Sequence, residues 1–334
     1  MNDFMNEKKL EQYPIPDKRK TPKISQQFAS KRQARTKSAL IDDYISSQLT
    51  LVNEINIQSY IDELITFHNR HSKSHFIYQV AEWIRNKLIG FGYSETDLFY
   101  HEYKEQDYQL KNLVCIKKGI SDKVILLCAH YDTILIANTE DIVSRAPKAN
   151  DNASGVSALL EIARIMLAIN TDYTIQFVFF SGEEQGLWGS KHYAKKMKDD
   201  NEDILLVLNM DMCGETGFLP HNNTTFIDID DGSTGIVDEN NEMSQYFGQK
   251  MEQNAKDYTE LAVEFDPIYA SDYMPFEARG YVCIGAYDGS AIDENPNYHT
   301  QLDLPENLNM SFLVSVTKMV LAFVLSESQY IIDK

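Results

Sequence analysis

The stretch VILLCAHYD at residues 124–132, followed by ANDNASGVSALLEIARIM at residues 149–166, decides the fold. Its first part is a short run, apolar on both faces, that ends in His130 and Asp132. Its second part starts with small and turn-forming residues and continues with apolar residues at the three- and four-residue steps of an amphipathic helix. A buried strand followed by a helix is the unit from which helix-covered parallel sheets are built. The stretch therefore predicts an α/β protein.

The same alternation of apolar runs and helical stretches continues on both sides. Two amphipathic helices are predicted, over residues 55–65 and 76–88, and Gly90 and Gly92 end the second. Five runs have the length and composition of buried strands: Leu113–Ile116, Val124–Cys128, Ile175–Phe180, Ile204–Leu208 and Tyr281–Ile284. No repeat and no Pro- or Gly-rich linker divides residues 50–334. The sequence thus predicts a single globular α/β domain there, with a mixed, largely parallel sheet sandwiched between helices.

Residues 1–45 differ from the rest in composition. Between Lys18 and Lys37 there are eight basic residues and no acidic one, with three prolines nearby. This composition predicts a solvated, poorly ordered N-terminal tail. A docking arm for an anionic partner and a removable pro-segment remain open as alternatives.

The overall composition excludes several classes of protein. With 334 residues, of which 43% are hydrophobic, the chain can bury a large core, so disordered and collagen-like classes do not apply. The net charge of −19 opposes binding to nucleic acid or to anionic membranes. The four cysteines form no CxxC pair, which favours buried thiols over a disulfide framework or a cysteine-only zinc site. A neutral or cationic ligand suits this chain better than a polyanion.

No uninterrupted apolar stretch reaches the roughly 18 residues of a membrane-spanning helix. The longest candidate, Phe312–Leu325, contains Ser315, Thr317 and Lys318, which predicts an amphipathic closing helix. The first 15 residues contain no apolar segment of the kind found in secretory signals. The sequence therefore predicts a cytoplasmic protein and leaves secretion or export to the periplasm by another route open.

Polar side chains follow three of the predicted strands. His130, the pair Glu183–Glu184 and Asp211 each lie at or just beyond the carboxyl end of a strand, where ligand sites of open α/β sheets collect. Asp151 precedes a predicted helix, and His299 follows much later in the chain. Taken singly, each has an ordinary structural explanation, such as helix capping for Asp151. We expect the three strand ends to converge on one site.

The donor atoms of this set suit a particular metal. Successive members from His130 to His299 (His130, Asp151, Glu184, Asp211, His299) are separated by 21, 33, 27 and 88 positions. Two imidazoles and three carboxylates are ligands that zinc accepts.

Five motifs in this order resemble those of the di-zinc aminopeptidases of the bacterial leucyl aminopeptidase and aminopeptidase Y type, whose clan also contains glutaminyl cyclases. The motifs are AHYDT (129–133), NDNASG (150–155), SGEEQGLWGS (181–190), LNMDM (208–212) and YHTQLD (298–303). The resemblance covers roughly residues 55–330 and implies the zinc-exopeptidase, phosphorylase/hydrolase-like fold.

The resemblance also implies roles for individual residues. Two zinc ions per chain would be held by five ligands: Asp151 shared by both, His130 and Asp211 for one, Glu184 and His299 for the other. Glu183 would be the general base acting on a metal-bound hydroxide. Asp132 would orient the imidazole of His130.

The segment SDYMPF (271–276) resembles a family segment that lines the cleft, so Asp272 and Tyr273 are predicted to contact substrate. The family commonly has His after this aspartate, so Tyr273 departs from the pattern. Candidate walls for the first residue of the substrate, each with plain core packing as its alternative, are Phe218, Tyr269, Tyr273, Phe276 and Tyr287.

These implications predict a metallo-aminopeptidase that hydrolyses the N-terminal bond of peptides with a free N-terminus. A glutaminyl cyclase with a single zinc is the alternative within the clan. A co-catalytic carboxypeptidase is disfavoured, because 88 positions between Asp211 and His299 leave little room for its additional domain. An inert domain on the same fold would be expected to lose ligands. Nothing in the sequence indicates the oligomeric state.

Overall fold

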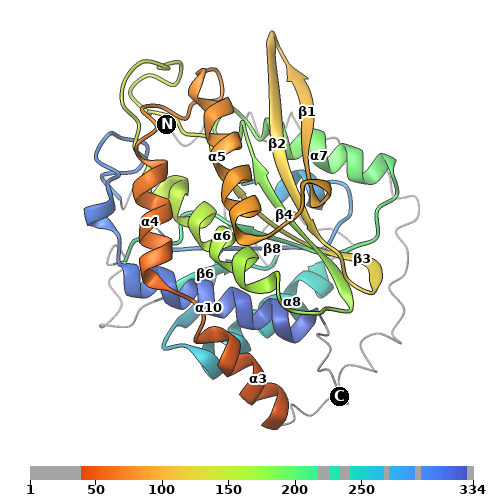
Figure 1. The fold of residues 1–334 in the computed structure, drawn as a ribbon. Helices are drawn as coiled ribbons and strands as arrows, with labels where there is room; N and C mark the ends of the chain where they lie inside the picture. The colour runs from red at the N-terminus through yellow and green to blue at the C-terminus, as the bar shows by residue number, and fades with distance from the viewer. Residues whose placement is uncertain (1–38, 217–225, 233–240, 267–270, 290–294, 329–334) are drawn as a thin grey trace.

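The computed structural model describes residues 39–216, 226–232, 241–266, 271–289 and 295–328 (Figure 1). It contains an eight-stranded sheet in the order β1-β2-β4-β3-β5-β8-β6-β7. The strands are β1 (Leu98–Glu105), β2 (Tyr108–Lys117), β3 (Ser121–His130), β4 (Tyr173–Phe180), β5 (Ile204–Met210), β6 (Phe226–Asp230), β7 (Ala262–Phe265) and β8 (Cys283–Tyr287). The predicted mixed α/β fold is confirmed, and each of the five predicted runs overlaps a strand.

The centre of the sheet is parallel and its edges are mixed. Strands β4, β3, β5 and β8 run parallel to one another, whereas β1 is antiparallel to β2, and β2 is antiparallel to β4. At the other edge β6 is antiparallel to β8 and parallel to β7. All eight residues of β4 are buried, as expected for a strand with helices on both faces. The three strands that carry the candidate site residues are therefore adjacent and point the same way.

Two layers of helices cover the sheet. The helices are α3 (Ala39–Leu49), α4 (Glu54–Leu64), α5 (Phe76–Phe91), α6 (Gly155–Met166), α7 (Trp188–Asp199), α8 (Asn241–Tyr258), α9 (Met274–Glu277) and α10 (Met310–Glu327). On β3, Ile125 and Leu127 pack in the core beneath α4, α5, α6 and α10, while Leu126 and Cys128 face the core beneath α7 and α9. This alternation is the two-residue period of a strand that is apolar on both faces.

The two helices predicted near the start of the domain are present as α4 and α5. Helix α5 ends at Gly92, which has φ of 116°, in the left-handed region that favours glycine. Residues 39–45, which the sequence assigned to the tail, instead belong to α3, and Ile45 on that helix is fully buried. The prediction was wrong there because the basic composition ends at Lys37, just before an apolar helix face begins. The remaining tail, residues 1–38, lies outside the described residues.

Helix α10 is more buried than the prediction of an amphipathic closing helix implied. Ser311 is exposed, but all residues from Met319 to Leu325 are buried against the sheet and neighbouring helices. Among the described residues α10 is the one helix with the length and hydropathy to cross a membrane, and 67% of its apolar window is buried inside the fold. Core helices of folded domains share these properties.

Candidate metal centre

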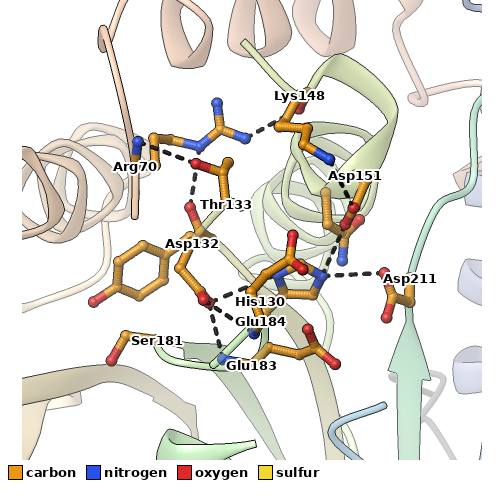
Figure 2. A network of polar contacts seen from close by, with 12 residues as sticks. Arg70, His130, Asp132, Thr133, Lys148, Asp151, Ser181, Glu183, Glu184 and Asp211 are labelled. Atoms are coloured by element: carbon orange, nitrogen blue, oxygen red, sulfur yellow. Dashed lines mark hydrogen bonds and ion pairs between the residues drawn. The ribbon is translucent and has the colours of Figure 1, made fainter. Parts of the chain in front are cut away.

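The candidate site lies at the carboxyl ends of three neighbouring strands (Figure 2). His130 is the last residue of β3, Glu183 and Glu184 follow β4, and Asp211 follows β5 directly. Asp151 comes from the segment 149–154 that precedes α6, and His299 comes from the connection before α10. Because β3 is parallel to both β4 and β5, their carboxyl ends lie at the same edge. The structure therefore brings together the five predicted ligands from five separate segments.

The first group of ligand atoms surrounds the imidazole of His130. Its Nε2 atom lies 3.2 Å from Oδ1 of Asp211 and 3.3 Å from Oδ1 of Asp151. The ligand atoms of these three residues lie within 4.8 Å of one another, and all three residues are buried. A single metal ion can contact atoms at this separation.

The second group surrounds His299. Its Nε2 atom lies 2.9 Å from Oδ2 of Asp151 and 3.0 Å from Oε2 of Glu184. These ligand atoms also lie within 4.8 Å of one another. Asp151 thus presents one oxygen to each group, which is the arrangement of a carboxylate that bridges two metal ions.

The chemistry of the donors fits a metal at both groups. One imidazole nitrogen and two carboxylate oxygens meet in each group, and zinc binds such nitrogen and oxygen ligands. Oε1 of Glu184 is buried without a hydrogen-bond partner in the described part of the chain. Burial disfavours the charged form of His130, but Asp211, Asp132 and Asp151 outweigh it and raise its pKa well above the usual range. A cation of some kind is favoured among these carboxylates.

Asp151 is free to bind a metal because its neighbour caps the helix. Oδ1 of Asn152 accepts the N–H of Gly155 at 2.9 Å, and Nδ2 of Asn152 donates to the carbonyl oxygen of Met210 at 2.9 Å. The side chain of Asp151 points instead to His130 and His299. The ordinary alternative for Asp151, capping of α6, is therefore the role of Asn152.

Asp303 holds the segment Ala149–Ser154 in place. This segment carries Asp151 and is called the bridging segment below. Its Oδ1 accepts the N–H of Asn150 at 2.7 Å, and its Oδ2 accepts the N–H of Asp151 at 3.0 Å. Asp303 is buried, although it ends the YHTQLD motif on a distant part of the chain. Sequence reasoning assigned it no role, and its place in that motif was the signal that could have found it.

Asp132 contacts the loop after β4 more closely than it contacts His130. Its Oδ1 lies 3.7 Å from Nδ1 of His130, which is longer than a hydrogen bond. The same carboxylate accepts the N–H of Glu183 at 3.1 Å and the N–H of Glu184 at 3.2 Å. The predicted orientation of the imidazole is thus the weaker of its contacts, and Asp132 mainly fixes the backbone that carries Glu183 and Glu184.

Glu183 has the surroundings of a group that holds a proton. Burial raises the pKa of its carboxyl well above the ordinary value, and the nearby carboxylates of Glu184, Asp211 and Asp272 raise it further, while His130 opposes them. A carboxylate of raised pKa can take a proton and release it again.

Two buried cations, Arg70 and Lys148, border the site, and no sequence motif indicated either of them. Arg70 is fully buried and donates from Nη1 to the carbonyl oxygen of Pro147 at 2.6 Å and from Nη2 to that of Lys148 at 3.0 Å. Burial lowers the pKa of Arg70 to about 10. Lys148 is also fully buried, and its Nζ lies 3.4 Å from Oδ2 of Asp151 (Figure 2).

The predicted substrate contacts are placed differently. Tyr273 is 4% exposed and packs in the core beneath α7 and α9, and its hydroxyl donates to Asp230. Phe276 and Tyr287 are buried in the same cluster, as the core alternative predicts. Asp272 is fully buried, and burial is the main reason that its pKa is raised to about 7. Tyr273, Phe276 and Tyr287 have the placement of core side chains, not of walls open to a ligand. Asp272 is buried close enough to His130 and Asp211 to interact with both electrostatically. Phe218 and Tyr269 lie outside the described residues.

The fold and the two ligand groups together define a class. The chain is an α/β protein with a candidate two-metal centre. Histidine and carboxylate ligands adjoin one another at the carboxyl ends of the parallel strands in its helix-covered sheet. Sequence comparison makes the assignment more specific. The model of peptidase family M28 matches residues 112–324, and the chain belongs to this family.

Several known proteins are similar to this chain in sequence or in fold. A probable leucine aminopeptidase of Arthroderma otae is 28% identical over 301 residues, covering 86% of this chain and 76% of the relative. The LapA aminopeptidase of Legionella pneumophila has a similar structure, with a TM-score of 0.76 and 21% identity over 97% of this chain and 82% of that one. A glutaminyl cyclase of Tannerella forsythia has a TM-score of 0.65 and 20% identity, covering 82% of this chain and 99% of that one. Both solved structures are similar to this chain in fold.

Proposed function

We propose that this chain is a zinc-dependent aminopeptidase that uses two metal ions to remove the N-terminal residue of peptides. The observation that carries the proposal is the sharing of Asp151, whose Oδ1 faces His130 and whose Oδ2 faces His299. Zinc bound in such a site lowers the pKa of a coordinated water to about 7 and polarises a carbonyl oxygen. The aminopeptidase names of the fungal relative and of LapA support this activity.

The residues of the chain supply the rest of the chemistry. Glu183 would take a proton from the attacking water and deliver it to the departing amine, a contribution of typically about 10²- to 10⁴-fold in rate. Asp132 would hold Glu183 in place through the backbone N–H that it accepts at 3.1 Å. Asp303 would hold Asp151 in the same way at 3.0 Å. Both contacts fix a functional side chain through its own backbone.

Recognition of a free α-amine would make the enzyme an exopeptidase. The amine is cationic below its pKa of about 7.7 to 8.0, and the net charge of the chain, −19, would favour its approach. The name of the Arthroderma otae relative supports an apolar first residue such as leucine. We therefore propose small peptides with an apolar N-terminal residue as substrates.

One experiment tests both the need for zinc and the recognition of the free amine. The full chain is treated with a chelator, reloaded with zinc, and assayed on leucyl, alanyl, glutamyl and lysyl anilides, with N-acetyl-leucyl anilide as the matched blocked substrate. We expect cleavage of leucyl anilide only after zinc is restored, and no cleavage of the acetylated compound. Cleavage of the blocked compound at the same rate would contradict recognition of the amine.

A glutaminyl cyclase is the second candidate, and the Tannerella forsythia structure favours it. A peptide with N-terminal glutamine, analysed by mass spectrometry, distinguishes the two. Loss of the whole glutamine residue supports the aminopeptidase. Loss of ammonia with the chain otherwise intact would replace our proposal by the cyclase.

A further inference from the structure

The ammonium of Lys148 lies beside one of the two ligand groups. Its Nζ is 3.4 Å from Oδ2 of Asp151, the oxygen that faces His299 at 2.9 Å. The other oxygen of Asp151, Oδ1, is the one that faces His130. The same ammonium is close enough to Glu184 and His299 to interact electrostatically with both. The ammonium of Lys148 is thus placed at the group formed by Asp151, Glu184 and His299.

Lys148 has little freedom to leave this position. The residue is fully buried, and its φ of 50° lies in the left-handed region, which favours glycine. The carbonyl oxygen of Lys148 accepts from Nη2 of the buried Arg70 at 3.0 Å and from the N–H of Ala153 at 3.3 Å. The centroid of the Tyr298 ring lies 5.6 Å from Nζ of Lys148. The backbone is therefore fixed at this residue, and the side chain is fully buried.

A buried cation at a metal site opposes the binding of a second cation. The ammonium and a metal ion in this group would share Oδ2 of Asp151 as a ligand, and like charges at such distances repel strongly where water is excluded. In the group formed by His130, Asp151 and Asp211, Asp151 contributes Oδ1, which is not the oxygen that Lys148 contacts. The repulsion therefore falls unequally on the two groups.

We infer that Lys148 makes the two metal sites unequal, so that the group of His130, Asp151 and Asp211 binds zinc tightly and the group of Asp151, Glu184 and His299 binds it weakly. This inference rests on the two-metal site of the proposed function. It makes the second metal of the resting protein exchangeable, and it makes the occupancy of that site depend on the free zinc concentration.

Calorimetric titration of the chelator-treated full chain with zinc tests the inference, with bound metal counted by elemental analysis. We expect two binding steps in the wild type. His299→Ala should remove the weaker step and keep the tighter one, whereas Asp211→Ala should remove the tighter step. Loss of the tighter step in His299→Ala would overturn the assignment of the sites.

Lys148→Met, which keeps the volume and removes the charge, should tighten the weaker step by at least about tenfold while the tighter step changes much less. Lys148→Gly removes the same charge and suits the left-handed backbone, so it should give the same result if the methionine variant folds poorly. Lys148→Arg keeps the charge and should keep the two steps apart. Lys256→Met, on an exposed position of α8, is the matched control and should change neither step.

Three outcomes separate the inference from the proposed function. Unchanged spacing of the steps in both neutral variants would overturn the role of Lys148, even with two zinc ions bound. Weaker binding of the second zinc in those variants would also overturn it, since it would mean that Lys148 organises the ligands. A wild-type chain that binds no zinc would instead contradict the proposed function.

Discussion

Asp151 illustrates how the role of one residue depends on its neighbour. A carboxylate at the start of a helix usually caps it, because the free N–H groups there need acceptors. In this chain Asn152 accepts from Gly155, and Asp303 accepts from the N–H of Asp151 itself. The carboxylate of Asp151 is therefore left to contact the two histidines and the ammonium of Lys148. Because Asn152 and Asp303 accept these backbone N–H groups, the side chain of Asp151 is available to bind a metal.

Glu183 can be tested without disturbing the ligands. Glu183→Gln keeps the shape of the side chain but removes its ability to take a proton. We expect kcat on leucyl anilide to fall by about 10²- to 10⁴-fold while the zinc content stays at the wild-type value. Steady-state kinetics and elemental analysis measure the two quantities. Glu306→Gln, on the exposed surface, is the control, and turnover of the Glu183 variant within a few-fold of wild type would remove Glu183 from the mechanism.

At the scale of elements, α6 links the site to the helices on the outside of the sheet. Its first turn follows the bridging segment, and further along the same helix Glu161 is fully buried. Oε1 of Glu161 accepts the N–H of Asn53 at 2.8 Å, at the start of α4, and Nη2 of Arg164 at 2.7 Å. One carboxylate thus fixes two helices against each other behind the site.

Removal of this carboxylate should destabilise the fold without reaching the metal ligands. In Glu161→Ala the N–H of Asn53 and the guanidinium of Arg164 lose a part-buried acceptor, and among the described residues Arg164 keeps only the carbonyl oxygen of Leu51. We expect the free energy of unfolding to fall by about 2 to 3 kcal/mol, measured by urea denaturation, with zinc content unchanged.

The matched control is Asp199→Ala, which breaks the ion pair with Lys195 on α7. Both of those side chains are more than half exposed, at 60% and 65%. Its loss should cost less than about 0.5 kcal/mol. Equal effects of the two variants would show that the link between α4 and α6 contributes little.

At the scale of the whole molecule, the site joins segments that are distant in the sequence. Five carboxylates come close together from four of them: Asp132, Asp151, Glu183, Glu184 and Asp211. Without a cation these charges repel one another in a buried place, so metal binding and folding are coupled. The stability of the whole fold should depend on the metal.

Removal of zinc should therefore lower the melting temperature of the chain. At a free zinc concentration of about 100 times Kd, binding contributes about 2.7 kcal/mol, which corresponds to a shift of about 4 to 5 °C for a domain of this size. Thermal unfolding with and without chelator measures the shift. Asp151→Ala should show no such shift, because it lacks the shared ligand. A wild-type melting temperature that the chelator leaves unchanged would argue against a metal held in the folded chain.

The amino-acid pattern was enough to predict the central strands, the helices α4 and α5, and the residues that end the strands. These features are encoded locally, because a strand or helix that is buried on one or both faces repeats its apolar residues with a fixed period. The edge strands β1 and β7, and β6 next to β7, carry polar residues among apolar ones, and no run of the kind seen in β4 marked them. Residues 39–45 have an apolar helix face as well, but they were assigned to the tail because of the basic composition that precedes them.

Only the tertiary structure decided which side chains face one another. It placed Tyr273 in the core, gave the capping of α6 to Asn152, and brought Asp303 to the bridging segment. It also put the ammonium of Lys148 beside one ligand group and not the other, which no spacing along the chain could reveal. The physical reason is that burial and electrostatic partners depend on contacts between segments far apart in sequence, whereas periodicity records only which way a residue points on its own element.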